Sequence, residues 1–95
     1  MDRASTEHLM TPVTATSGDP STYPVQVAVV PADERPTDTD WHDATWTTSG
    51  SETFATLLVG PSGTVNPGPG TFRAWVKLTA TPEVPVIPSA RFEIT

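Results

Sequence analysis

Cysteine is absent from this 95-residue chain, lysine and arginine are scarce, and no long apolar run occurs. Without cysteine no disulfide can stabilise the fold, and no thiolate is available to bind a metal or act as a nucleophile. Five cationic residues stand against eleven acidic ones, and the resulting net charge of -6 argues against direct binding of nucleic acid. No apolar run approaches the length that spans a bilayer, so no membrane segment is expected. Residues 1–10 are polar and lack the apolar core of a signal peptide, so we expect the protein to act in the cytoplasm or in an assembly built there.

Proline and glycine are the residues that define the fold class, because eleven prolines and six glycines divide the chain into short pieces. Proline removes a backbone donor and clashes with the preceding helical turn, so long helices are excluded. The β-branched and aromatic residues fall in short runs between these breakers, which is typical of strands. We predict one all-β domain over residues 21–95, an immunoglobulin-like β-sandwich of six or seven short strands preceded by an extended N-terminal arm over residues 1–20. A small open barrel is the alternative.

Alternation of apolar and polar residues identifies the faces of the strands. The clearest case is the run over residues 71–79, where Phe72, Val76 and Leu78 share one face with Ala74, and a different set occupies the other face. The predicted core comprises Val25, Val27, Val29, Trp46, Phe54, Leu58, Phe72, Val76, Leu78, Phe92 and Ile94.

The N-terminal arm, residues 1–20, is rich in serine and threonine and poor in large apolar residues. We expect it to be extended, with an edge strand around residues 11–16. Two interpretations stay open: the arm packs on its own domain, or it lies across a neighbouring subunit.

Catalytic and metal-binding motifs are not recognisable. Asp40, His42 and Asp43 cluster in sequence, but adjacent residues of a strand alternate faces and rarely converge on one ion. No serine lies in a nucleophile elbow, and the glycine-rich segments are Pro-Gly turns with no helix to receive a phosphate. We therefore expect no cofactor, no metal and no enzymatic activity.

The second face of residues 71–79 carries the strongest signal for an interaction. Arg73, Trp75 and Lys77 share it, and tryptophan beside arginine is typical of interface hot spots. The alternative is a tryptophan covered by its own cationic neighbours or stacked with one of them.

Apolar residues on both faces near Leu57 and Val59 indicate burial on both sides or an interface. The interface hypothesis predicts that Trp75→Asp leaves the domain folded, unlike a Trp46→Asp control.

Five segments in order carry a resemblance to a known family: VQVAVV (25–30), DWHDATW (40–46), LLVGP (57–61), GTFRAWVKLT (70–79) and TPEVP (81–85). Together they resemble the small immunoglobulin-like structural proteins encoded beside the capsid and head-completion genes of tailed phages that infect actinobacteria. The resemblance covers about residue 23 to the C-terminus and implies a virion protein. The implied role is a capsid decoration or head-associated protein, present in many copies in a symmetric array. It would bind the major capsid protein or another virion subunit through a sheet face and the arm.

Two other roles remain open at this point. A head–tail connector or tail component belongs to the same class and differs in the number of copies per particle. A carbohydrate- or host-surface-binding module belongs to another class, with Trp41 and His42 as a stacking platform beside the acidic loop.

Overall fold

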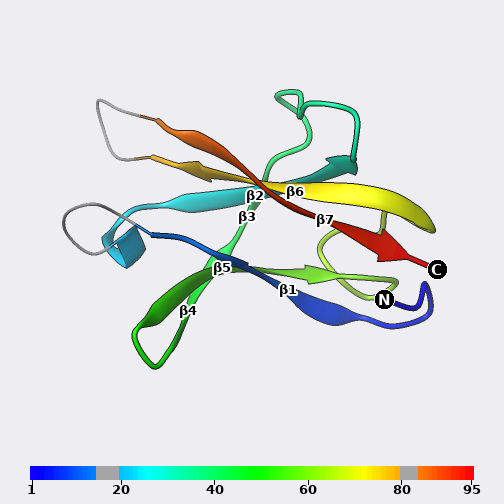
Figure 1. Ribbon diagram of the computed structural model, residues 1–95, viewed down its shortest axis with the longest axis horizontal. Coiled ribbons are helices and arrows are strands. Elements are labelled where there is room, and N and C mark those ends of the chain that lie inside the picture. The colour runs from blue at the N-terminus through cyan, green and yellow to red at the C-terminus, as the bar shows by residue number, and fades with distance from the viewer. Residues whose placement is uncertain (15–19, 80–83) are drawn as a thin grey trace.

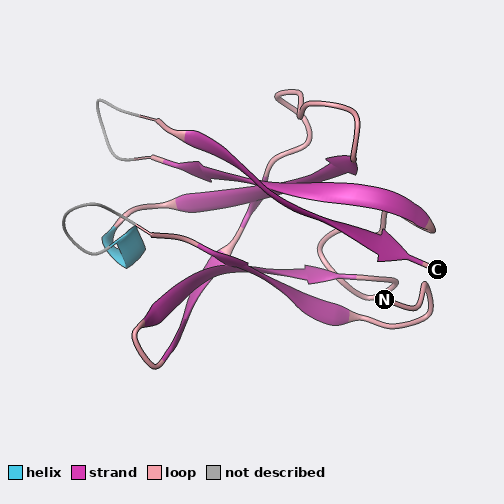
Figure 2. Ribbon diagram, in the orientation of Figure 1, coloured by secondary structure: helices cyan, strands magenta, loops and turns pink. Residues whose placement is uncertain are grey.

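The structure is a computed structural model that describes residues 1–14, 20–79 and 84–95. These residues form seven strands in two antiparallel sheets, and the expected all-β sandwich is confirmed (Figures 1 and 2). One sheet has the order β1-β5-β4 and the other the order β3-β2-β6-β7. The strands are β1 (Glu7–Pro12), β2 (Val25–Pro31), β3 (His42–Asp43), β4 (Thr45–Ser49), β5 (Glu52–Val59), β6 (Gly70–Leu78) and β7 (Val86–Ile94).

The core lies between the two sheets and follows the alternation of the strands. On β6 the side chains of Phe72, Ala74, Val76 and Leu78 are buried in it. Of the other residues predicted for the core, the structure buries Val25, Val27 and Ile94, and it packs Val29, Trp46 and Phe92 partly buried against them.

The two faces of β5 are the reverse of what the sequence pattern predicts. Ala55, Leu57 and Val59 point into the core, whereas Phe54 and Leu58 lie half-buried on the outer face of the three-stranded sheet. The register sets this, because Leu9 of β1 pairs with Leu57 and Trp46 of β4 pairs with Ala55, and directly paired residues share a face. Both faces of this strand are apolar, so alternation alone did not distinguish them.

The predicted N-terminal arm is largely part of the sandwich. Strand β1 pairs along its whole length with β5 as an edge strand, with Pro12 opposite Phe54. Closer to the terminus, the backbone of Met1 and Arg3 bonds to the end of β7: the amide of Thr95 donates to the carbonyl of Met1, and the amide of Arg3 donates to the carbonyl of Thr95, both at 2.8 Å. The two termini accordingly lie at the same end of the molecule (Figure 1).

The arm therefore packs on its own domain at residues 1–3 and 7–12, because the exposed edges of β5 and β7 offer backbone partners there. Residues 15–19 of the predicted arm and residues 81–83 of the TPEVP segment lie outside the described residues. The only helical element in the described part of the chain is a single 3₁₀ turn, η1 (Pro20–Thr22), so no helix there is long enough to cross a membrane.

Gly60, directly after β5, is held where a side chain has no room. Its φ is +133°, and a Cβ added there would collide with the carbonyl oxygen of Ser5 and lie 2.6 Å from the Cα of Thr6. We predict that Gly60→Ala lowers the free energy of unfolding by about 2–3 kcal/mol, because strain and backbone collision add together.

Gly50→Ala is the matched control for this substitution. Gly50 has a φ of +62°, but nothing lies within 4 Å of an added Cβ, so only the cost of the left-handed conformation, about 1 kcal/mol, is expected. Urea denaturation of the two variants measures the difference, and equal losses would contradict the close approach of residues 5–6 to Gly60.

Candidate partner-binding surface

The outer face of the four-stranded sheet carries a second, smaller apolar cluster. Ala28 and Val30 of β2 and Trp75 of β6 are buried in it, and Trp41 packs against them partly buried. Ala28 pairs directly with Trp75 across the two strands. The segment between β2 and β3, residues 32–41, supplies the cover, which is why Val30 is buried although it faces away from the main core.

Two cations stack on the tryptophans of this cluster. The guanidinium carbon of Arg35 lies 5.1 Å from the ring centroid of Trp75, and the ammonium nitrogen of Lys77 lies 4.4 Å from that of Trp41. Both distances fall within the range of cation–π attraction. The stacking alternative considered for Trp75 is thus present, although its cation is Arg35 and not a residue of β6.

Trp75 itself is not available as a contact for a partner, because only 7% of it is exposed. The prediction that its ring forms the centre of an interface is not compatible with this burial. Leu57 and Val59 are removed from the predicted interface on the same ground, since they are 2% and 0% exposed inside the main core. Of the five predicted interface residues, Arg73 and Lys77 remain, both on the outer face and both half-buried.

Most of the cationic residues of the chain lie on this face. Four of the five cationic residues of the chain lie there, namely Arg35, Arg73, Lys77 and Arg91, and none of them forms an ion pair with a described residue. Their acidic surroundings are Glu93 on β7, Asp43 on β3, whose carboxylate accepts from the amide of Gln26, and Asp33 and Glu34 in the turn before Arg35. We name these four cations the cationic face.

Arg73 and Arg91 are cross-strand partners within the cationic face. They are directly opposite each other on β6 and β7, and paired residues of an antiparallel ladder have Cβ atoms about 4.5–5.5 Å apart. The Nε atom of Arg73 and the Nε1 atom of Trp75 are both buried, and neither has a hydrogen-bond acceptor among the described residues. Like charges in this position destabilise a sheet, so the pair is a feature that folding alone does not favour.

The cluster over residues 40–43 does not form a ligand set. His42 pairs with Val27 and Asp43 with Gln26, so the two side chains leave β3 on opposite faces. The carboxylate of Asp40 accepts from the amide and the hydroxyl of Thr37, at 2.7 and 3.0 Å. Over the described ranges, no three His, Asp or Glu side chains are grouped as a metal site requires.

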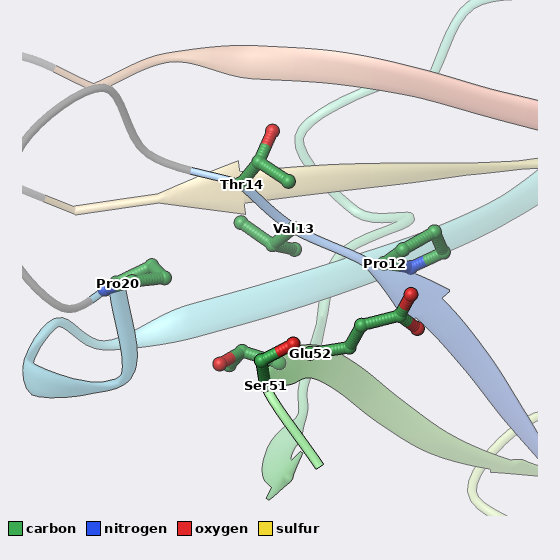
Figure 3. Close-up of a pocket in the computed structure, with 7 residues that line it drawn as sticks. Pro12, Val13, Thr14, Pro20, Ser51 and Glu52 are labelled. Atoms are coloured by element: carbon green, nitrogen blue, oxygen red, sulfur yellow. The ribbon is translucent and has the colours of Figure 1, made fainter. Parts of the chain in front are cut away.

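A pocket of 310 Å³ lies between the end of β1 and the turn that joins β4 to β5 (Figure 3). Among the described residues that line it, Glu52 is the only one with an ionisable side chain, and the others offer hydroxyl groups and apolar atoms. Figure 3 shows the Glu52 carboxylate extended toward Pro12. General acid–base catalysis commonly uses two titratable groups with different pKa values, and the described lining contributes one carboxylate. The lining comprises Pro12, Val13, Thr14, Pro20, Ser51, Glu52 and Thr53.

Sequence reasoning found two members of the cationic face and missed the other two. Arg35 was missed because it lies in a loop, where no periodicity indicates the face that a side chain will cover. Arg91 was missed as the neighbour of Arg73 because their pairing depends on a register that shifts between Arg73 and Trp75. No sequence signal short of that register identifies the pair.

Comparison with known proteins gives no relative from which a function can be transferred. No family model, no curated protein and no solved structure matches the chain.

Proposed function

We propose that this chain is a structural subunit of a tailed-phage virion, a capsid decoration or head-associated protein that acts by binding and not by catalysis. Its docking surface is the cationic face, and its partner is the major capsid protein or another virion subunit. The observation that carries the proposal is that four of the five cations of a chain with a net charge of -6 lie on one sheet face and form no ion pair with a described residue. A surface of this kind steers an encounter and selects a complementary partner.

The proposal includes an immunoglobulin-like topology. Immunoglobulin sandwiches combine a sheet with neighbouring strands B, E and D with a second sheet in which C lies beside F and G, and variable domains add C′ beside C. The orders β1-β5-β4 and β3-β2-β6-β7 correspond to B-E-D and C′-C-F-G when the strands are taken in chain order. Residues 1–3, beside the end of β7, then stand where an additional N-terminal strand would run.

We do not propose that the N-terminal arm docks on a neighbouring subunit. The backbone of residues 1–3 and 7–12 is paired with β7 and β5, so these residues contribute to the sandwich and are not free to lie across a neighbour. The carbohydrate-binding alternative is also weakened, because the Lys77 ammonium stacks on the ring of Trp41 that a sugar would need.

Incorporation into particles tests the proposal. An epitope-tagged copy of the protein is expressed during infection by the phage that encodes it, and the particles are purified on a density gradient and analysed by quantitative mass spectrometry. We expect the tagged chain to co-purify with the major capsid protein in many copies per particle, as a symmetric array requires. Few copies would indicate a connector or tail component instead. Absence from purified particles would contradict a virion role.

A further inference from the structure

The structure assigns a carboxylate-binding site to the Arg73–Arg91 pair, and we propose that its ligand is an acidic segment of a neighbouring protein subunit. The inference rests on the proposed function, since it names the chemistry of the partner that the cationic face would dock against. It draws on the geometry of two strands, β6 and β7, and on the charge balance of the whole chain.

Both guanidinium groups leave the sheet on the same face, and neither has a carboxylate partner among the described residues. Arg73 and Arg91 are cross-strand partners, and neither forms an ion pair with a described residue. Glu93 is two residues from Arg91 on the same face, and it too forms no ion pair within the described part of the chain. Eleven acidic residues occur in the chain, so the lack of a paired carboxylate is not due to a shortage of acids.

Arg73 has a partly buried side chain. Its Nε atom is buried, and no described residue accepts a hydrogen bond from its guanidinium. Arg73 lies on β6 between two cross-strand partners, Val30 of β2 and Arg91 of β7, so its side chain leaves the outer face of the sheet between theirs. Arg73 as a whole is only half-buried. A guanidinium without an internal acceptor can bind a carboxylate with two parallel hydrogen bonds.

The charge of the chain selects the class of anion. Phosphates of a nucleic acid also bind arginine, but an extended polyanion would meet the acidic remainder of a chain with a net charge of -6. The turn before Arg35 contains Asp33 and Glu34, which border the cationic face and would repel such a polymer. A short acidic peptide segment that ends within the arginine pair avoids this repulsion.

The test uses fluorescence anisotropy with three labelled probes on the full chain. The probes are an oligo-glutamate peptide, an oligo-glutamine peptide of the same length and an oligothymidylate of the same charge. We expect saturable binding of oligo-glutamate at low salt, which weakens as potassium chloride is added, and no binding of oligo-glutamine. Tighter binding of oligothymidylate than of oligo-glutamate would overturn the inference in favour of a nucleic-acid site, and absence of oligo-glutamate binding would overturn it outright.

The variants locate the site. The double substitution Arg73→Gln with Arg91→Gln should weaken binding of oligo-glutamate about tenfold or more. Arg3→Gln is the control for loss of charge elsewhere, because it removes one positive charge from the one arginine outside the cationic face, as Arg91→Gln does within it, and it should change affinity by about twofold or less. If the double variant does not fold, Arg91→Gln alone, at an exposed position, should give a smaller loss in the same direction. Equal affinity of wild type and Arg91→Gln would overturn the assignment.

The two proposals fail separately. If the chain binds oligo-glutamate but is absent from particles, the virion role is contradicted and the arginine site is still supported. If the Arg73→Gln, Arg91→Gln double variant is incorporated into particles as efficiently as the wild type, the arginine pair is not needed for docking. The virion role would not be contradicted by that result.

Discussion

Replacing Leu57 by alanine should lower the free energy of unfolding by about 3 kcal/mol, within the usual range of about 2–5 kcal/mol for a buried leucine. Leu57 is 2% exposed and is among the largest fully buried side chains of the described core. A domain of this size has a total stability of roughly 5–15 kcal/mol, so the substitution removes a large share of it. Chemical denaturation at equilibrium measures the loss.

Leu58→Ala is the matched control, because it deletes the same atoms one residue further along the same strand. Leu58 lies half-buried on the outer face of the three-stranded sheet, and the expected loss is about 1 kcal/mol or less. If Leu58→Ala proved the more damaging of the two, the register of β5 against β1 would be wrong and the two faces of the strand would be exchanged.

Trp75→Ala should cost about 3–5 kcal/mol, as expected for a large aromatic side chain removed from a packed site. The residue is 7% exposed and packs with Ala28, Val30 and Trp41, and Arg35 covers its ring. The structure therefore reverses the expectation for Trp75→Asp, which should unfold the domain much as Trp46→Asp does. Thermal melts followed by circular dichroism measure both effects.

Trp75→Phe separates the packing of the ring from its indole N–H group. The buried Nε1 atom has no acceptor among the described residues, so its removal relieves a cost while most of the apolar ring is kept. We expect a change of about 1 kcal/mol or less in either direction. A Trp75→Ala variant as stable as wild type would show that residues 32–41 do not cover the outer face.

The sequence predicted the fold class because proline, glycine and strand-forming residues alternate along the whole chain. It also predicted the two faces of β6. Phe72, Val76 and Leu78 alternate with charged residues there, so only the apolar face can be the one that packs in the core. On β5 both faces are apolar, and the core face depended on pairing with β1 and β4. Tertiary register decided what local alternation left undetermined.

The candidate surface was predictable only in part, for the same physical reason. Arg73 and Lys77 follow from alternation, but the burial of Trp75 depends on a loop that returns over the sheet and places Arg35 on its ring. The pairing of Arg73 with Arg91 depends on the register of β6 against β7, which shifts between Arg73 and Trp75. Neither contact is local in sequence, and neither leaves a periodic signal.

A small domain without disulfides gains stability from any partner that binds only its folded form. The Arg73–Arg91 pair opposes folding in the isolated chain, because like charges face each other across two strands. Carboxylates of a neighbouring subunit would convert this repulsion into charge-assisted hydrogen bonds. Many weak contacts of this kind in a symmetric array add up to firm attachment.

A map of the intact particle tests the central proposal most directly, because it shows both whether the chain is present and which face it turns to its neighbour. We expect density for the sandwich in a symmetric array, with the outer face of the β3-β2-β6-β7 sheet against an acidic segment of another subunit and with Arg73 and Arg91 at the contact. Density in which this face is turned to solvent, or a particle with no density for the chain, would contradict it.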